Sequence, residues 1–214
     1  MSVEVKICGI NSVESAQAAK IASFVGFVFY PKSPRYINGK EAQKLSRYLP
    51  KNVKKVGLFV EEEDEKISEI LSSIKLDYLQ FHGDESPNRI DEVRKKFKLP
   101  IIKAIKIKKE EDLENAYPYY KYADMLLFDT KPPEGSKDLM PGGNAISFDW
   151  KILSKKNFPI SWMLSGGLNA QNITKAIAVS GAKIIDVSSG VEESRGNKSA
   201  KLIKEFLEIS KKIN

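Results

Sequence analysis

The chain alternates short apolar segments with helix-like segments along its length, and this alternation limits its possible folds more than any other feature. Valine, isoleucine, leucine and phenylalanine dominate the apolar segments, which is typical of buried strands. The predicted strands are residues 3–8, 25–30, 53–60, 77–82, 99–106, 124–129, 160–165 and 183–188. Helical segments are predicted after each of them, at 14–22, 39–48, from 61–64 onward, 86–97, 109–116, from 148–153 onward, 169–180 and 198–212.

Strands that alternate with helices indicate a parallel sheet, and eight such units close into a (β/α)8 barrel, or TIM barrel. The 214 residues lie near the lower size limit for this fold, so we expect residues 1–214 to form a single domain. A doubly wound open sheet is the structural alternative. Its Gly-x-Gly-x-x-Gly turn would follow the first strand, where Gly9 stands alone.

Composition excludes several classes of function. The net charge of +7 suits nucleic acid or an anionic small molecule, but aromatic residues are not interleaved with the basic ones as a base-stacking surface requires. One cysteine and one histidine argue against disulfides and against metal sites built from these residues. The longest apolar run, 24–30, is short and no signal peptide opens the chain, so we expect a reduced, cytoplasmic protein without membrane contact.

Strand alternation sorts the side chains into two sets. The polar set comprises Lys6, Cys8, Gln80, His82, Lys103, Asp129, Ser165 and Asp186. The opposite positions are apolar and suit packing under helices: Val5, Ile7, Leu79, Phe81, Ile102, Ala104, Leu126, Phe128, Ile185 and Val187. We therefore expect the polar set to face the barrel interior near the carboxyl ends of the strands, where barrel enzymes have their active sites.

Two glycine-bearing turns follow the last two predicted strands. They contain Gly166 and Gly167 in the first turn and Ser189 and Gly190 in the second, before a possible short helix at 191–193. Loops at these positions bind phosphate in such barrels, because backbone N–H groups converge there. Tight turns that merely need glycine are the alternative interpretation.

Cys8 and Asp129 end the first and sixth predicted strands, on different sides of the barrel mouth. A thiol and a carboxyl group across a substrate suit proton transfer from carbon and to oxygen. We expect Lys6, on the same strand face, to favour the Cys8 thiolate, and Met125 and Leu127 to help Asp129 retain a proton. The alternative for Cys8 is a buried structural cysteine. The alternatives for Asp129 are a helix cap and a salt bridge to Lys131.

The sequence resembles the phosphoribosylanthranilate isomerase family of tryptophan biosynthesis. The matching segments span the chain from residue 5 to the last helix and occur in the family's order: KICGI at 6–10, GFVFYPKSPRY at 26–36, VGLFV at 56–60, QFHG at 80–83, FDT at 128–130, FDW at 148–150, LSGGL at 164–168 and DVSSGVE at 186–192.

The resemblance implies an aldose–ketose isomerase that needs no cofactor. It would convert N-(5-phosphoribosyl)anthranilate into 1-(2-carboxyphenylamino)-1-deoxyribulose 5-phosphate by an Amadori rearrangement. By the family's pattern Asp129 is the general acid, Cys8 the general base, and Arg35 the ligand of the anthranilate carboxylate. Phosphate would lie against Gly166, Gly167, Ser189 and Gly190, while Lys6, Gln80, His82 and Asp186 would line the substrate site. A solvated loop arginine and a structural histidine are the alternatives for Arg35 and His82.

Three positions depart from the family's pattern: Asn11 replaces a common threonine, Ala145 a glycine and Ile146 a common lysine. Because the last two fall in a loop, they bear on turnover more than on the type of reaction. Competing functions are the related histidine-pathway isomerase, which would use two carboxylates, a metal-dependent epimerase, which would need several histidines, and a phosphosugar-binding protein without activity. The sequence leaves open a monomer or a homodimer.

Overall fold

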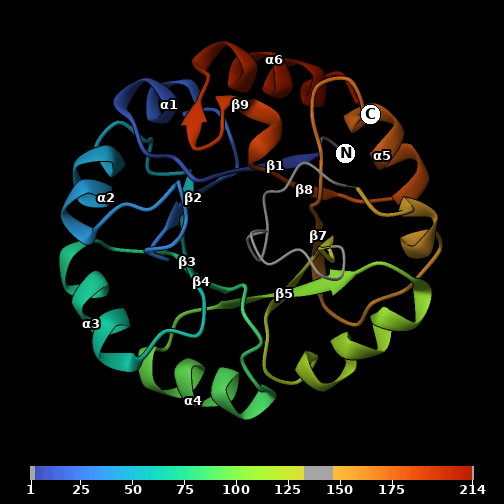
Figure 1. Cartoon of the computed structure of the whole chain (residues 1–214), viewed down its shortest axis with the longest axis horizontal. Coiled ribbons are helices and arrows are strands. Elements are labelled where there is room, and N and C mark those ends of the chain that lie inside the picture. Colours follow the sequence, from blue (N-terminus) through green and yellow to red (C-terminus); the bar gives the residue numbers. More distant parts are fainter. Residues whose placement is uncertain (1–2, 133–146, 214) are drawn as a thin grey trace.

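The computed structural model describes residues 3–132 and 147–213, and these form a closed parallel barrel surrounded by helices (Figure 1). Each strand pairs with its neighbour in chain order, and β1 also pairs with β8, which closes the barrel and excludes an open sheet. The strands are β1 (Glu4–Cys8), β2 (Phe24–Val28), β3 (Lys54–Phe59), β4 (Tyr78–Phe81), β5 (Ile101–Ile107), β6 (Met125–Thr130), β7 (Ser161–Leu164) and β8 (Ile184–Val187). The expected (β/α)8 barrel is confirmed.

The outer layer contains α1 (Val13–Ala18), α2 (Gly39–Ser46), α3 (Asp64–Ser73), α4 (Pro87–Phe97), α5 (Ile173–Ser180) and α6 (Ala200–Lys211). Local signals set several of their starts. The Ser86 hydroxyl accepts a hydrogen bond from the backbone N–H of Arg89 at 3.2 Å, and Pro87 occupies the first turn of α4, as the sequence predicts. Ser12 caps α1 in the same way.

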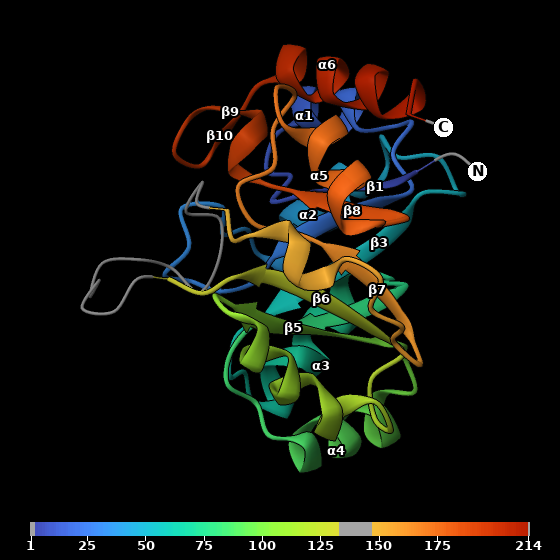
Figure 2. The ribbon, with the colours of Figure 1, turned by 90° about the vertical axis from the view of Figure 1, so that its right-hand side faces the viewer.

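Two predicted helices are 3-10 helices instead: η1 (Glu110–Tyr119) and η2 (Trp150–Leu153). Pro118 lies inside η1 and has no amide hydrogen for an α-helical bond. The helix expected at 191–193 is also wrong. A 3-10 turn, η3 (Ser189–Val191), leads into an antiparallel hairpin of β9 (Glu192–Ser194) and β10 (Asn197–Lys198). Figure 2 shows this hairpin at the end of the barrel where the strands finish.

The core has two layers. One large cluster lies between the strands and the helices and includes Val5, Ile7, Leu79, Phe81 and Phe128. A second cluster fills the barrel interior with Phe24, Val56, Ile102, Ala104, Met125, Leu127, Met163 and Ile184. Above it, Cys8, Val28 and Leu58 form a small apolar group toward the open end.

The assignment of β5 to its two faces was wrong. Ile102 and Ala104 belong to the interior cluster, whereas Ile101, Ile105 and Ile107 pack under the helices. Lys103 therefore lies on the helix side, where its Nζ donates to the Gly83 carbonyl at 2.8 Å and to Glu85 at 3.0 Å. A buried lysine is tolerated there because Glu85 pairs with it. Because both faces of β5 are apolar, its sequence has no polar–apolar alternation that indicates on which side Lys103 lies.

Candidate active site

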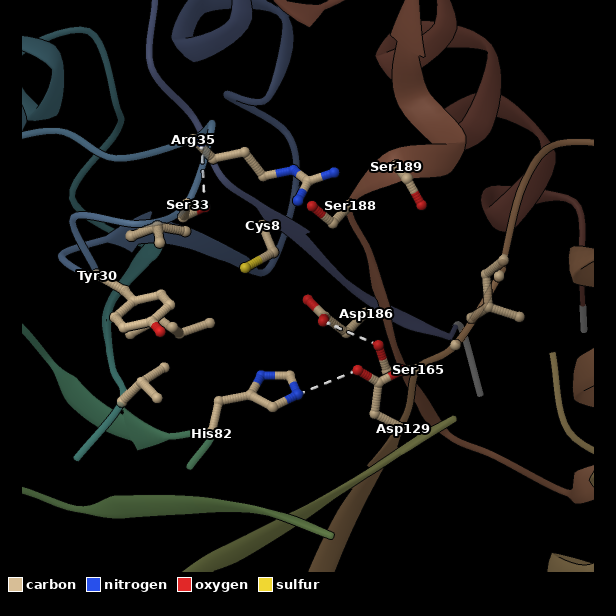
Figure 3. Close-up of a pocket in the computed structure, with 16 residues that line it drawn as sticks. Cys8, Tyr30, Ser33, Arg35, His82, Asp129, Ser165, Asp186, Ser188 and Ser189 are labelled. Carbon is tan, nitrogen blue, oxygen red and sulfur yellow. Dashed lines mark hydrogen bonds and ion pairs between the residues drawn. The ribbon is translucent and has the colours of Figure 1, made fainter. Parts of the chain in front are cut away.

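A pocket opens at the carboxyl ends of the barrel strands, and polar side chains from distant parts of the chain point into it (Figure 3). Its lining residues are Cys8, Val28, Tyr30, Ser33, Arg35, Leu58, Val60, His82, Asp129, Ser165, Gly166, Gly167, Leu168, Asp186, Ser188 and Ser189. Most of the predicted site residues therefore meet in one place. Lys6 and Gln80 are fully buried and, like Gly190, do not line the pocket; they support residues that do.

Cys8 lies on the β1 side of the pocket and is 4% exposed. Burial raises the pKa of its thiol; Lys6 and Lys198 act in the opposite direction, while Asp186 adds to the rise. Lys6 favours the thiolate, as expected, but burial outweighs this effect, and the net pKa of the Cys8 thiol is raised. Lys6 also donates to Asp186 at 2.7 Å, and this carboxylate acts on the pKa of Cys8 in the opposite direction to Lys6.

Asp129 lies on β6 and is linked to His82, which follows β4. His82 Nε2 is 3.1 Å from Asp129 Oδ2, and the Gln80 amide lies 3.4 Å from His82 Nδ1. The imidazole of His82 thus lies between Gln80 and Asp129, with one ring nitrogen facing each of them. The other oxygen of Asp129 accepts from the Thr130 backbone N–H at 2.8 Å. The Asp129 carboxyl therefore contacts His82 and the Thr130 backbone. The nearby Lys131 lies 3.9 Å from Asp112 instead.

Asp186 connects the two walls of the pocket. One of its oxygens pairs with Lys6, and the other accepts from the Ser165 hydroxyl at 3.2 Å. Ser165 follows β7, so β1, β7 and β8 are joined through one carboxylate beneath the pocket. This arrangement fixes the floor on which a ligand would rest.

Arg35 follows β2 and is a buried residue, 4% exposed, rather than a solvated loop arginine. Its Nε and Nη2 donate to the two oxygens of Glu192 at 2.6 and 2.9 Å. The stem of Arg35 crosses directly over Gly9, where a Cβ atom would lie 2.7 Å from the arginine Cδ. Gly9 also has a φ of +83°, so two separate constraints require glycine beside Cys8.

The loops after β7 and β8 approach each other closely at the pocket rim. A Cβ atom on Gly190 would lie 1.8 Å from the Leu168 carbonyl oxygen. Gly166 and Gly167 have φ values of +93° and +62°, which turns their backbone toward the pocket that they line. Ser188 and Ser189 complete this rim from the β8 side. The rim offers backbone N–H groups and hydroxyls to an anion.

Sequence reasoning assigned no role to Glu192 or Lys198. Glu192 lies within the matching segment 186–192, so a signal for it existed. Lys198 gave none, because it is one of many lysines toward the end of the chain. Asn11, one of the unusual positions, donates to the Gly196 carbonyl at 2.8 Å and so contacts the β9–β10 hairpin. The other two, Ala145 and Ile146, lie outside the described residues.

Within residues 3–132 and 147–213, histidine, cysteine, aspartate and glutamate side chains form no group that could hold a metal ion. None of the helices in this part of the chain has the length and apolar character that crossing a bilayer requires.

Known protein sequences are similar to this chain over nearly its whole length. Residues 5–209 match the family model of N-(5'phosphoribosyl)anthranilate (PRA) isomerase. An N-(5'-phosphoribosyl)anthranilate isomerase from Paramagnetospirillum magneticum is 43% identical over 213 residues, covering 99% of this chain and 98% of the relative.

Solved structures are similar to this chain in the same way. The phosphoribosyl anthranilate isomerase of Thermotoga maritima superposes with a TM-score of 0.85 at 38% identity, covering 98% of this chain and 99% of the other. A structure of such an isomerase in complex with reduced 1-(o-carboxyphenylamino)-1-deoxyribulose 5-phosphate gives a TM-score of 0.80 at 36% identity, with the same coverage. A further Thermotoga structure shows monomers made from the dimeric enzyme, with a TM-score of 0.80 at 37% identity and again the same coverage.

Proposed function

The chain belongs to the N-(5'-phosphoribosyl)anthranilate isomerase family and catalyses that isomerisation in tryptophan biosynthesis, and we propose that it does so by general acid–base catalysis with Cys8 and Asp129. The observation that carries this assignment is that both residues line one pocket, from β1 and from β6 on different sides. A substrate between them meets a base on one side and an acid on the other.

Asp129 protonates the ring oxygen of the phosphoribosyl group, and the sugar opens to a Schiff base. The hydrogen bond to His82 orients the carboxyl group, and Met125 and Leu127 provide an apolar layer beneath it; both features support this role.

Cys8 then removes the proton from C2 of the sugar, which gives an enolamine that becomes the ketone. Because burial raises the pKa of the thiol, its thiolate is scarce at neutral pH but is a strong base when formed. Proton removal from carbon benefits from that strength. The same sulfur lies beside Gly26, where a Cβ atom would approach it to 2.9 Å, so the absence of a side chain on β2 leaves room for the thiol.

The two ends of the substrate would be held by different parts of the pocket. Arg35 points its guanidinium group toward the pocket (Figure 3), and this group would pair with the carboxylate of the anthranilate end in a fixed planar geometry. Gly166, Gly167, Ser189 and the backbone at Gly190 would hold the phosphate from the loops after β7 and β8. Lys6, Gln80 and Asp186 support this arrangement from below, and Asp186 also faces the ligand.

We further propose that residues 1–214 act as one domain in the cytoplasm, where Cys8 stays a reduced thiol. A phosphorylated small molecule is then the partner that the site requires, without nucleic acid. The monomer or homodimer expected from the sequence stays a prediction, which light scattering after gel filtration decides.

The test is turnover of freshly generated N-(5-phosphoribosyl)anthranilate, followed by fluorescence, for wild type, Cys8→Ser and Asp129→Asn. We expect each variant to lose at least roughly 10³-fold in kcat, since each removes one proton-transfer group. Binding of the reduced product analogue is the control, because both substitutions conserve size and leave the rest of the pocket intact.

Activity that survives in Cys8→Ser would contradict the assignment of the base. Activity that survives in Asp129→Asn would do the same for the acid. A wild-type protein that binds the analogue but never turns over substrate would contradict the proposed mechanism altogether.

A further inference from the structure

Behind Arg35 lies a buried group of three charged side chains, which we call the Arg35–Glu192–Lys198 cluster. Their side chains are 5%, 4% and 0% exposed, and the two cations share one carboxylate. Glu192 Oε1 accepts from Arg35 Nε at 2.6 Å and from Lys198 Nζ at 2.7 Å. Glu192 and Lys198 do not line the pocket, so they can influence a ligand only through residues that do.

The β9–β10 hairpin brings this cluster together. Glu192 begins β9 and Lys198 ends β10, and the turn between them presses Gly196 against the loop that carries Arg35. A Cβ atom on Gly196 would lie 2.6 Å from the Pro34 carbonyl oxygen. The Gly196 N–H donates to Glu192 Oε2 at 3.1 Å. The hairpin is thus fitted to the arginine loop by backbone as well as by charge.

Lys198 and Arg35 share the Glu192 carboxylate, so the charge of protonated Lys198 offsets part of the effect that Glu192 has on Arg35. If Lys198 lost its proton, the negative charge of Glu192 would act on Arg35 without this offset. The arginine would then attract a carboxylate less strongly.

We propose that Glu192 and Lys198 are positioning residues that hold Arg35 against Gly9, and that the charge of protonated Lys198, by offsetting part of the Glu192 charge, strengthens the attraction of Arg35 for the carboxylate of the substrate. The proposal rests on the proposed role of Arg35, and it adds the residues that control that role.

The surroundings of Lys198 place its titration within a useful pH range. Burial lowers its pKa to about 8, although Glu192 acts to raise it; Arg35 lowers it further, and Cys8 raises it slightly. These groups face Lys198 from β9, from the loop after β2 and from β1. Above this pH the lysine becomes neutral, so affinity for a carboxylate should fall as the pH rises through about 8.

The experiment compares two ligands, the reduced 1-(o-carboxyphenylamino)-1-deoxyribulose 5-phosphate and its carboxamide counterpart, by calorimetry between pH 7 and 9.5. The ratio of their affinities reports the carboxylate contact and cancels effects on the phosphate. In wild type we expect this ratio to fall roughly tenfold over the range, as expected for the loss of one nearby charge.

Two variants separate charge from structure. Lys198→Arg keeps a cation that does not titrate in this range, so its ratio should stay flat up to pH 9.5. Lys198→Met should show the low ratio at every pH. Lys201→Met, which removes an exposed lysine from α6, is the matched control and should behave as wild type.

The proposal would be overturned by an affinity ratio that does not change with pH in wild type, or by a ratio that still falls in Lys198→Arg. The comparison with Lys198→Arg remains decisive even if Lys198→Met fails to fold. Lys198 also donates to the Ser188 carbonyl and hydroxyl at 2.8 and 3.1 Å, so it could act on the loop that we assign to phosphate. Equal losses of affinity for both ligands in Lys198→Met would show this and would also overturn the proposal. Failure of wild type to bind either ligand would instead contradict the proposed function.

Discussion

At the scale of single residues, the surroundings of Cys8 determine how often it is a thiolate. Two lysines, Lys6 and Lys198, lower its pKa, but each is paired with a carboxylate, and burial outweighs them. Cys8 is therefore a weak acid in the ligand-free protein. A cysteine activated by an unpaired cation would behave in the opposite way.

We therefore predict that iodoacetamide modifies Cys8 slowly at pH 7 and that the rate still rises between pH 8 and pH 9.5. The thiolate is the reacting form, and its pKa is raised from the ordinary value of 9.0. Mass spectrometry follows the reaction without ambiguity, since the chain has one cysteine. A rate that reaches its plateau below pH 8 would contradict the effect of burial.

At the scale of elements, the loops after β7 and β8 depend on each other through Gly190. Its close approach to the Leu168 carbonyl leaves no room for a methyl group, and both atoms belong to backbone that cannot rotate away. The two loops therefore form one unit, and this unit carries the rim that we assign to phosphate. By contrast, Gly181 ends α5 with a φ of +74° and has open space around its Cα.

We predict that Gly190→Ala reduces affinity for the reduced product analogue at least tenfold, because the clash of about 1–3 kcal/mol is relieved by moving the two loops apart. Calorimetry measures this directly. Gly181→Ala is the matched control: it should cost roughly 1–2 kcal/mol of stability from backbone strain and leave affinity unchanged. Similar affinities for both variants would show that the two loops do not form one phosphate site.

At the scale of the whole molecule, the Lys6–Asp186 pair lies where the barrel closes. The two residues are partners in the register between β1 and β8, although 180 positions separate them in the chain. Burial acts to lower the pKa of Lys6, but Asp186, with a smaller effect from Cys8, more than offsets it, and the net change is a rise above 10.5. The charged pair therefore joins the first and last strands.

We predict that Lys6→Met lowers the free energy of unfolding by about 3–5 kcal/mol, because it leaves the Asp186 carboxylate buried without its partner. The double variant Lys6→Met/Asp186→Leu should recover part of this loss. Urea unfolding followed by tryptophan fluorescence measures both.

The pH dependence of this pair follows from the raised pKa of Lys6. Its contribution is complete below the unfolded-state pKa of 10.5 and disappears only as the pH rises through the higher folded-state value. The difference between wild type and Lys6→Met should therefore stay constant from pH 7 to pH 9. A difference in the free energy of unfolding that shrinks between pH 7 and pH 9 would contradict the raised pKa of Lys6.

Local sequence patterns are enough to predict the order of strands and helices and the residues at several strand tips. Hydrophobic periodicity is a local property, so it located β1 and β8 and placed Cys8, Asp129 and Asp186 on the inward face. It failed at β5, where both faces are apolar and Lys103 alone suggested the inward direction.

Which charged side chains pair with one another depends on the folded chain. Lys6 pairs with Asp186 across the barrel seam, and Lys198 reaches Arg35 through Glu192 at the hairpin. Lys6 and Asp186, and likewise Arg35 and Glu192, lie far apart in the chain, and nothing local in a lysine-rich sequence shows which lysines are buried. Burial and these pairings together set the pKa of Cys8, so the chemistry of the site depends on contacts that no segment specifies alone.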